Sequence, residues 1–291
     1  MRVLAVGIAT VDIVNTVAFY PSEDDELRAE AQDIRRGGNA TNTLVVLSQL
    51  GHQCSWAGTI ADDPDGRFVL DELVRSEIDT GSCRHYSRGK TPASYILLNR
   101  SSGSRTIVHY RDLPEYLADD FFQIDLAQFD WVHFEGRNIG ETQEMLRYLK
   151  QRSPRLAVSL EVEKNRDGID VLFSLPDVLL FSKVFSLSRG YALPVELFSA
   201  MRALNPYALL VCAWGDQGAW LQSPEGQVIH VPAYRPLQIV DTLGAGDVFN
   251  AGMIDGLLRG DPPETALRDA VRLAGIKCGL NGLHGLIDQN D

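Results

Sequence analysis

The chain has 291 residues, of which 45% are hydrophobic and 23% are charged, so its composition excludes disordered, fibrous and low-complexity proteins. Its 27 basic and 39 acidic residues give a net charge of −12, which argues against nucleic acid or an anionic membrane as a partner. The four cysteines are scattered, and no apolar run is long enough to cross a bilayer. We therefore expect a cytoplasmic protein with reduced thiols.

Hydrophobic periodicity predicts strands and helices that alternate along most of the chain. The predicted strands cover residues 3–6, 54–61, 92–99, 105–110, 131–136, 156–163, 177–182 and 209–214, with a hairpin over 218–235. The predicted helices cover residues 39–50, 66–77, 140–151, 194–204, 247–259 and 263–278. This alternation predicts an α/β fold whose central sheet is mostly parallel and covered by helices on both faces.

Two segments depart from this alternation. Residues 11–36 are rich in charge and lack a helical period, and residues 92–111 contain two strands joined by a polar turn. We expect them to form a small β-sheet lid on a single domain of residues 1–291.

A glycine-rich turn near the C-terminal end carries the strongest functional signal. A strand is predicted to end at Val240, the turn Gly244-Ala245-Gly246 follows, and a helix begins at Asp247. Glycines let the backbone approach a ligand, and free N–H groups at a helix N-terminus bind anions. Asp247 would then be placed to accept a proton. The same residues also fit a plain tight turn in which aspartate caps the helix.

A second polar group lies near the N-terminal end. Asn39 and Asn42 follow Gly38 and are three residues apart, so they share one face at the start of a helix. Carboxamides both donate and accept hydrogen bonds and suit a polyol, although they also cap helices. Asp12 comes just past the first strand, where α/β folds gather ligands.

Together the two glycine motifs resemble the signatures of the ribokinase-like (PfkB) carbohydrate kinase family, in the same order and over essentially the whole chain. The resemblance is greatest to the ketohexokinase (fructokinase) group of that family. It rests on the segments 20–24, 36–40, 105–108, 133–138, 161–164, 211–214 and 277–280. It implies a ribokinase-like three-layer sandwich and ATP-dependent phosphorylation of a sugar, with a ketohexose such as fructose as the expected substrate.

The resemblance also implies roles for individual residues. Asp247 would be the base, the turn Gly244-Ala245-Gly246 the anion hole, and Arg105 the cation on the transferring phosphate. The sugar would be held by Asp12, Gly38, Asn39 and Asn42, and by Asp24 from a neighbouring subunit. Read without the family, Arg105 is equally a solvated hairpin residue and Asp24 one acid in a solvated run.

The nucleotide and its metal are assigned in the same way. The residues expected at the nucleotide are Ala213, Trp214, Gly215, Gly218, Ala270, Val271 and Lys183. The usual Asn-x-x-Glu element for Mg²⁺ is missing, so Glu161, Glu163 and Glu135 are the replacement carboxylates, acting through water. Glu161 and Glu163 also fit a solvent-facing acid pair, and Trp214 a core residue. A K⁺ ion is expected near Asp241 and Thr242.

Other readings stay open at this stage. The substrate could be ribose, a nucleoside, a 2-keto-3-deoxy sugar acid or a sulfonated sugar, or the chain could be a non-catalytic sensor. An acidic substrate would require a second cation, for which Arg137, Arg111 and Arg35 are candidates. Exposed apolar strands in the lid predict a homodimer that pairs lid to lid.

Overall fold

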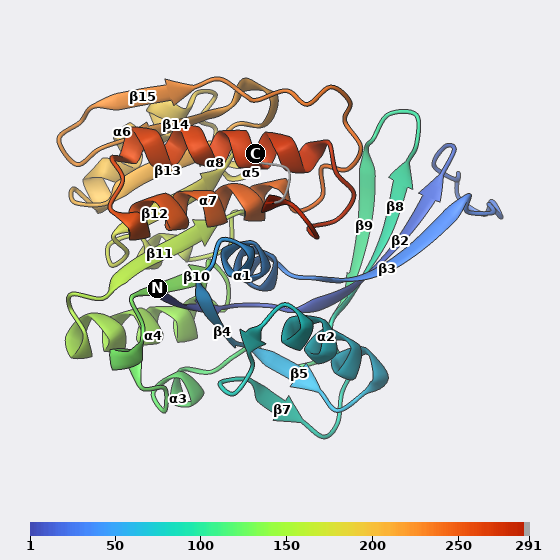
Figure 1. Ribbon diagram of the computed structural model, residues 1–291, viewed down its shortest axis with the longest axis horizontal. Helices are drawn as coiled ribbons and strands as arrows, with labels where there is room; N and C mark the ends of the chain where they lie inside the picture. The colour runs from blue at the N-terminus through green and yellow to red at the C-terminus, as the bar shows by residue number, and fades with distance from the viewer. Residues whose placement is uncertain (288–291) are drawn as a thin grey trace.

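In the computed structural model, which describes residues 1–287, a nine-stranded sheet forms the centre of the molecule (Figure 1). Its strand order is β15-β14-β13-β12-β11-β10-β1-β4-β6. The strands are β1 (Arg2–Val6), β4 (Gln53–Ala57), β6 (Ile78–Asp79), β10 (Trp131–Glu135), β11 (Ala157–Val162), β12 (Val178–Ser182), β13 (Leu209–Ala213), β14 (Ala219–Gln222) and β15 (Val228–Val231). The run from β13 to β6 is parallel, and β14 and β15 add an antiparallel hairpin at one edge.

Helices cover both faces of this sheet, as the sequence predicted. One face carries α1 (Asn39–Gln49), α2 (Pro64–Arg75), α7 (Ala245–Arg259) and α8 (Pro263–Cys278). The other carries α3 (Ala118–Phe121), α4 (Ile139–Arg152), α5 (Lys183–Ser188) and α6 (Pro194–Leu204). Side chains alternate along each strand, so Val3 and Ala5 of β1 join the first core, and Leu4 and Val6 join the second.

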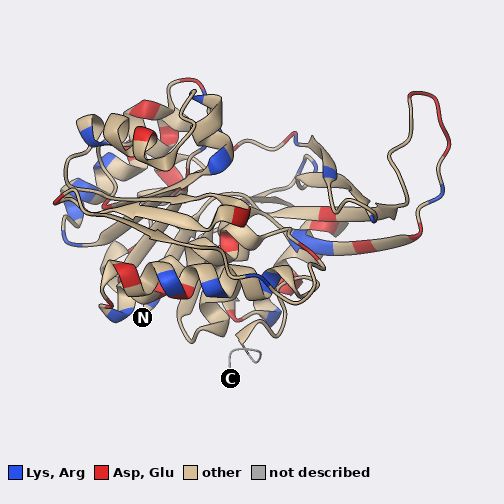
Figure 2. Ribbon diagram, turned by 90° about the horizontal axis from the view of Figure 1, so that it is seen from above, with Lys and Arg blue, Asp and Glu red and all other residues tan. Residues whose placement is uncertain are grey.

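A separate four-stranded sheet projects from one end of the molecule (Figure 1). Its order is β3-β2-β8-β9, with β2 (Thr10–Val17), β3 (Ala31–Gly37), β8 (Ala93–Asn99) and β9 (Arg105–Tyr110). We call this sheet the lid. The loop between β2 and β3 extends far beyond the body of the molecule (Figure 2). A third, two-stranded sheet pairs β5 (Thr59–Ala61) with β7 (Arg84–Tyr86).

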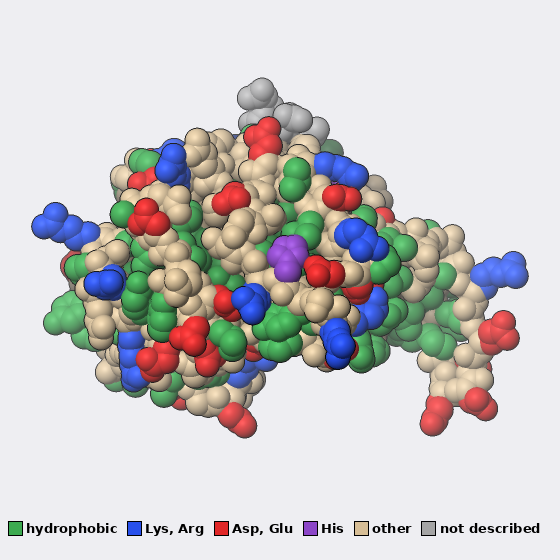
Figure 3. Space-filling model, turned by 90° about the horizontal axis from the view of Figure 1, so that it is seen from below, with side chains coloured by type: hydrophobic (Ala, Val, Ile, Leu, Met, Phe, Trp, Pro, Cys, Tyr) green, Lys and Arg blue, Asp and Glu red, His purple; other side chains and the backbone are tan. Residues whose placement is uncertain are grey.

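The surface shows no large region of one charge on the face drawn in Figure 3, where acidic and basic side chains are interspersed. Within residues 1–287, no helix combines the length and the apolarity needed to cross a membrane. Both observations agree with the moderate charge and hydropathy of the sequence.

Three local predictions were wrong. Residues 236–240 form no strand, so the glycine turn follows an irregular segment. The strand predicted over 54–61 is interrupted at Gly58, where a Cβ atom would lie 2.3 Å from the Trp56 ring, and divides into β4 and β5. Asp12 lies within β2 of the lid rather than in the turn after β1.

The packing of α7 on α8 depends on a glycine. A Cβ atom at Gly252 would lie 2.7 Å from Ala270 Cα, so the two helices would have to separate. We predict that Gly252→Ala lowers the free energy of unfolding by about 1–3 kcal/mol, although alanine is the better helix former. Gly140→Ala in α4 is the matched control, because its Cβ would meet no atom within 4 Å. Chemical denaturation of both variants tests this, and equal effects would contradict it.

Candidate functional site

The lid meets the body of the protein where β3 runs into α1. A Cβ atom at Gly37 would lie 2.1 Å from the Asp12 carboxylate, and one at Gly38 would lie 2.3 Å from the Ile8 carbonyl oxygen. Gly38 also has a φ of +103°, which favours glycine. The two glycines therefore allow Asp12, which is only 8% exposed, to lie directly against the start of α1.

The two carboxamides at the start of α1 make different contacts. Asn42 Nδ2 donates to Asp247 Oδ2 at 2.7 Å. Asn39 Nδ2 donates to Glu161 Oε1 at 3.2 Å and to Glu163 Oε2 at 3.3 Å. The N-terminal ends of α1 and α7 are thus joined directly, although the residues concerned are about 200 positions apart.

Asp247 lies in the first turn of α7 and is 6% exposed. Burial raises its pKa to about 8, and the carboxylates of Glu163 and Glu135 act in the same direction, while Asn42 and Arg36 lower it. Asp247 is therefore a carboxyl group that exchanges its proton near neutral pH. Beside it, Gly244 has a φ of +81°, and a Cβ atom at Gly246 would meet nothing within 4 Å. The turn leaves open space in front of the helix N-terminus, where an anion is stabilised.

The three glutamates predicted to hold Mg²⁺ differ in their surroundings. Glu161 is buried, its Oε1 accepts bonds from Asn39 and Asn250, and its Oε2 has no hydrogen-bond partner. Burial and the neighbouring carboxylates of Asp247, Glu135 and Glu163 raise its pKa well above the usual value. The unpartnered oxygen in an acidic environment fits a nearby cation.

Glu135, in contrast, is already engaged. Its carboxylate accepts the Ala40 N–H at 2.7 Å and pairs with Arg137 at 3.0 Å. It therefore holds the N-terminus of α1 in place and is a poor candidate for a metal ligand. Residues 1–287 also contain no group of three or more His, Cys, Asp or Glu side chains arranged to hold a metal on their own.

Side-chain cations surround the segment that precedes the glycine turn. Asp241 Oδ2 lies 3.0 Å from Arg35 Nη1 and 3.0 Å from the fully buried Lys277 Nζ, and its Oδ1 accepts the Leu243 N–H. Burial alone would raise the pKa of Asp241, but Lys277, the Leu243 N–H and Arg35 together hold it below the usual value. Two cations of the protein thus already balance the charge of Asp241, and K⁺ near Asp241 and Thr242 stays a prediction. Arg105 Nη1 reaches Thr242 Oγ1 at 3.3 Å.

The residues predicted at the nucleotide lie at the end of β13 and beyond. Trp214 is 3% exposed and packs on Trp220, and the Lys183 ammonium lies 5.8 Å from its ring centroid. Gly218 needs to be glycine, because a Cβ atom there would lie 2.0 Å from the Val231 carbonyl oxygen.

The remaining nucleotide-side predictions fall on the loop and on α8. Ala213 ends β13, and Gly215 has a φ of +64° in the loop that follows. Val271 is 7% exposed. Ala270 is fully buried against Gly252 of α7, so its position supports helix packing rather than an adenine contact.

Asp24 lies in a loop of the lid, and the three arginines considered for an acidic substrate are all in ion pairs. Asp24 is in the projecting loop between β2 and β3, with a φ of +70° (Figure 2). Arg111 pairs with Glu115, Arg137 pairs with both Glu115 and Glu135, and Arg35 pairs with Asp241. All three arginines proposed for an acidic substrate thus have carboxylate partners.

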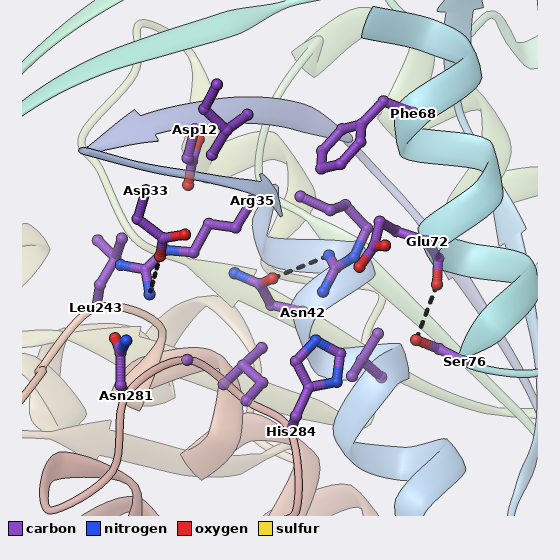
Figure 4. Close-up of a pocket in the computed structure, with 15 residues that line it drawn as sticks. Asp12, Asp33, Arg35, Asn42, Phe68, Glu72, Ser76, Leu243, Asn281 and His284 are labelled. Atoms are coloured by element: carbon purple, nitrogen blue, oxygen red, sulfur yellow. Dashed lines mark hydrogen bonds and ion pairs between the residues drawn. The ribbon is translucent and has the colours of Figure 1, made fainter. Parts of the chain in front are cut away.

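A cavity of about 310 Å³ opens beside Asn42, between the lid, α1, α2 and residues 281–284 (Figure 4). Asp12 and Leu243 line one side of it, and Phe68 and Glu72 of α2 line the other. Its lining joins Arg35 and Arg36 of β3 to Asn42 of α1.

Sequence reasoning assigned no role to three residues of this region, namely Arg36, Asn250 and Lys277. Lys277 could have been noticed as a cation on the otherwise apolar, buried face of α8. Arg36 directly precedes the two glycines, and Asn250 follows Asp247 by three residues on α7, so both were within motifs that had been identified.

The chain is similar to known carbohydrate kinases. The family model for pfkB family carbohydrate kinases matches residues 1–289. Mouse ketohexokinase is 38% identical, over 98% of this chain and 99% of that protein, and Bacillus subtilis ribokinase is 24% identical, over 100% and 97%.

Solved structures show the same fold. Arabidopsis thaliana ribokinase, complexed with ribose and ATP, superposes with a TM-score of 0.81 at 20% identity, covering 97% of this chain and 93% of that one. Thermotoga maritima ribokinase gives a TM-score of 0.79 at 22% identity, covering 98% and 95%. The ribokinase-like fold expected from the sequence is confirmed.

The raised pKa of Asp247 has a consequence for stability. In the unfolded chain this carboxyl ionises near pH 4, whereas in the folded protein it holds its proton to about pH 8. The free energy of unfolding therefore falls as the pH rises between these two values. We predict that Asp247→Asn, which cannot ionise, is more stable than the parent at pH 8. The difference should shrink as the pH falls toward 5. Thermal unfolding across this range measures it, and a difference that does not change with pH would contradict the prediction.

Proposed function

Because this chain belongs to the pfkB family of carbohydrate kinases, we propose that it transfers the γ-phosphoryl group of ATP to a hydroxyl group of a ketohexose such as fructose. The observation that carries the proposal is the position of Asp247, buried at the N-terminus of α7 beside the open glycine turn and held by Asn42. The full-length similarity to mouse ketohexokinase supports a ketohexose as the substrate.

Asp247 is proposed as the general base. Asn42 holds its Oδ2, while no hydrogen bond to its Oδ1 is made by any described residue, so Oδ1 is free to accept the proton of the attacking hydroxyl. A base works best when its pKa lies near the working pH, and burial raises the pKa of Asp247 to about 8. The proton moves to Asp247 as the sugar oxygen attacks phosphorus and ADP leaves.

The other parts of the site would bind and orient the two substrates. Asp12, Gly38, Asn39 and Asn42 lie together at the junction of lid and α1, where their polar groups can hold sugar hydroxyls. The backbone N–H groups of residues 244–246 would receive the transferring phosphate, and Arg105 lies close enough to add a positive charge. Catalysis would come from positioning and charge stabilisation.

Metal and nucleotide binding are proposed more narrowly than the sequence suggested. Glu161, through its unpartnered Oε2, and Glu163 fit the waters of a Mg²⁺ ion that arrives with ATP and offsets phosphate charge. Trp214, Gly215, Gly218, Ala213 and Lys183 remain the proposed nucleotide side. The geometry gives no support to K⁺ at Asp241.

We also propose a homodimer formed through the lid. Ile34, Ile13, Tyr95 and Val108 lie directly opposite one another across the four strands, so they form one apolar row on one face of the sheet. Ile34, Tyr95 and Val108 are 52%, 45% and 64% exposed. An exposed apolar sheet face of this kind is stabilised by pairing with a second copy.

The competing functions find less support. A sugar acid or sulfonated sugar requires a second cation at the sugar. The three candidates, Arg35, Arg111 and Arg137, are all paired with carboxylates, and the guanidinium of Arg36 donates to Thr41 and Asn42. A sensor without catalysis has no need for a buried carboxyl whose pKa is raised toward neutrality.

The direct test is a coupled ADP-release assay with ATP and Mg²⁺ on fructose, tagatose, ribose, adenosine and 2-keto-3-deoxygluconate. We expect the largest kcat/KM on a ketohexose. A larger kcat/KM on ribose, adenosine or the sugar acid would support the proposed kinase activity but contradict the proposed ketohexose substrate. Failure on every compound by a protein that binds ATP in calorimetry would refute the proposed function.

A pair of variants on one helix tests the base in the same assay. We expect Asp247→Asn to lower kcat about 10²–10⁴-fold. Asp255→Asn, also on α7, removes a carboxylate that pairs with His52 and Arg259 away from the turn, and should keep kcat within about twofold. Similar losses in both variants would speak against Asp247 as the base.

Mixing two inactive variants tests whether Asp24 acts on the neighbouring subunit. If it does, a site on an Asp24→Asn subunit becomes complete when its partner carries only Asp247→Asn. Equimolar mixing after subunit exchange should then restore roughly one active site in four, given random pairing into C2 dimers. No recovery in a mixture shown to contain hybrid dimers would place Asp24 in its own subunit's site or outside catalysis.

A further inference from the structure

Arg36 is a cation without a carboxylate partner at the centre of the site. Its Nη1 donates to Thr41 Oγ1 at 2.7 Å and to Asn42 Oδ1 at 2.9 Å, and no ion pair with a carboxylate is formed within residues 1–287. Both acceptors are neutral, and Thr41 is fully buried. Burial lowers the pKa of Arg36 to about 10. The nearby carboxylates of Asp12, Asp247 and Glu72 oppose this lowering, but the guanidinium directs its hydrogen bonds to Thr41 and Asn42, and these two bonds require an explanation.

The contact of Arg36 with Asn42 determines how the carboxamide is turned. An arginine side chain has only donors, so the amide group must present its oxygen to Arg36 and its NH₂ group to the opposite side. On that side lies Asp247, whose Oδ2 accepts the bond from Asn42 Nδ2 at 2.7 Å. Figure 4 shows Asn42 among the residues that line the cavity.

The reversed amide would be unfavourable at both ends. Asn42 Oδ1 would then face the Asp247 carboxylate, so that an acceptor meets an acceptor. Its NH₂ group would face the guanidinium, so that a donor meets a donor. The three side chains thus form a row, Arg36 to Asn42 to Asp247, that has one satisfied arrangement.

We propose that Arg36 is a positioning residue for phosphoryl transfer: it locks the Asn42 carboxamide so that Asp247 Oδ2 is held and Oδ1 stays directed at the acceptor hydroxyl. This inference rests on the proposed function, because it concerns the same base. Arg36 acts only through Asn42 and is not assigned a contact with either substrate.

A double-mutant cycle on kcat tests the dependence on Asn42. We expect Arg36→Met to lower kcat about 10- to 100-fold, the value of a hydrogen bond from a charged group, with the KM for ATP changed less than twofold. In an Asn42→Ala background, the same substitution should change kcat less than about twofold, because the amide through which it acts is gone. Full kcat in Arg36→Met, or an equal loss in both backgrounds, would overturn the proposal.

Two further variants control for folding and for changes in the lid. Gln32→Met is a matched substitution on β3, where the exposed side chain donates a hydrogen bond to Asn15, and it should retain wild-type kinetics. Arg36→Lys keeps a cation with several donors and should recover at least part of the loss, since the effect comes from orienting the amide. If Arg36→Met does not fold by circular dichroism, the cycle is run with Arg36→Lys under the same criterion of non-additivity.

The outcomes also separate this inference from the proposed function. A wild-type protein that phosphorylates no sugar would refute the proposed function. An active wild type and an inactive Asp247→Asn, together with a fully active Arg36→Met, would refute only the role of Arg36.

Discussion

The hydrogen bond from Asn42 to Asp247 joins residues that are 205 positions apart, and the arrangement of the site depends on it. It fixes the N-terminus of α1 against that of α7, so that the polar residues of the first glycine motif face the open turn of the second. Each end is held in turn, because Glu135 accepts the Ala40 N–H of α1, and Lys277 and Arg35 hold Asp241 ahead of the turn. The fold brings together two helix N-termini, which is where free N–H groups and positive partial charges concentrate.

The distribution of charge in this site differs from that of the whole protein. The chain carries a net charge of −12, yet a kinase must bind a polyanionic donor. Four cations, Arg35, Arg36, Arg105 and Lys277, lie around Asp247 and the segment that leads into the turn. Arg35 and Lys277 pair with Asp241, and Arg36 donates to Asn42, so in the proposed mechanism the nucleotide phosphates meet Arg105 and the backbone N–H groups of the turn.

The fold and the presence of the two glycine motifs could be predicted from the sequence, because parallel strands buried on both faces and glycine-rich turns leave clear local patterns. The cations around Asp241 could not be predicted, since Lys277 and Arg35 meet that carboxylate only through the tertiary fold. The prediction of a strand before the turn was wrong because it relied on hydrophobicity alone. Leu237, Ile239 and Val240 are apolar, but in the fold they are exposed. The bond from the Ala40 N–H to Glu135 could not be predicted either, because it forms only when β10 and α1 meet in the tertiary fold.

The distance along the chain between the two halves of the site has a consequence for its synthesis. The residues proposed to bind the sugar lie within the first 42 positions, whereas Asp241, Asp247 and Lys277 lie in the last 51. During translation the central strand β1 cannot pair with β10, its neighbour in the sheet, until more than 120 further residues have been made. A chain that lacks its last 51 residues lacks Asp241, the turn and Asp247, so the proposed phosphate site is complete only after nearly all of the 291 residues have been made.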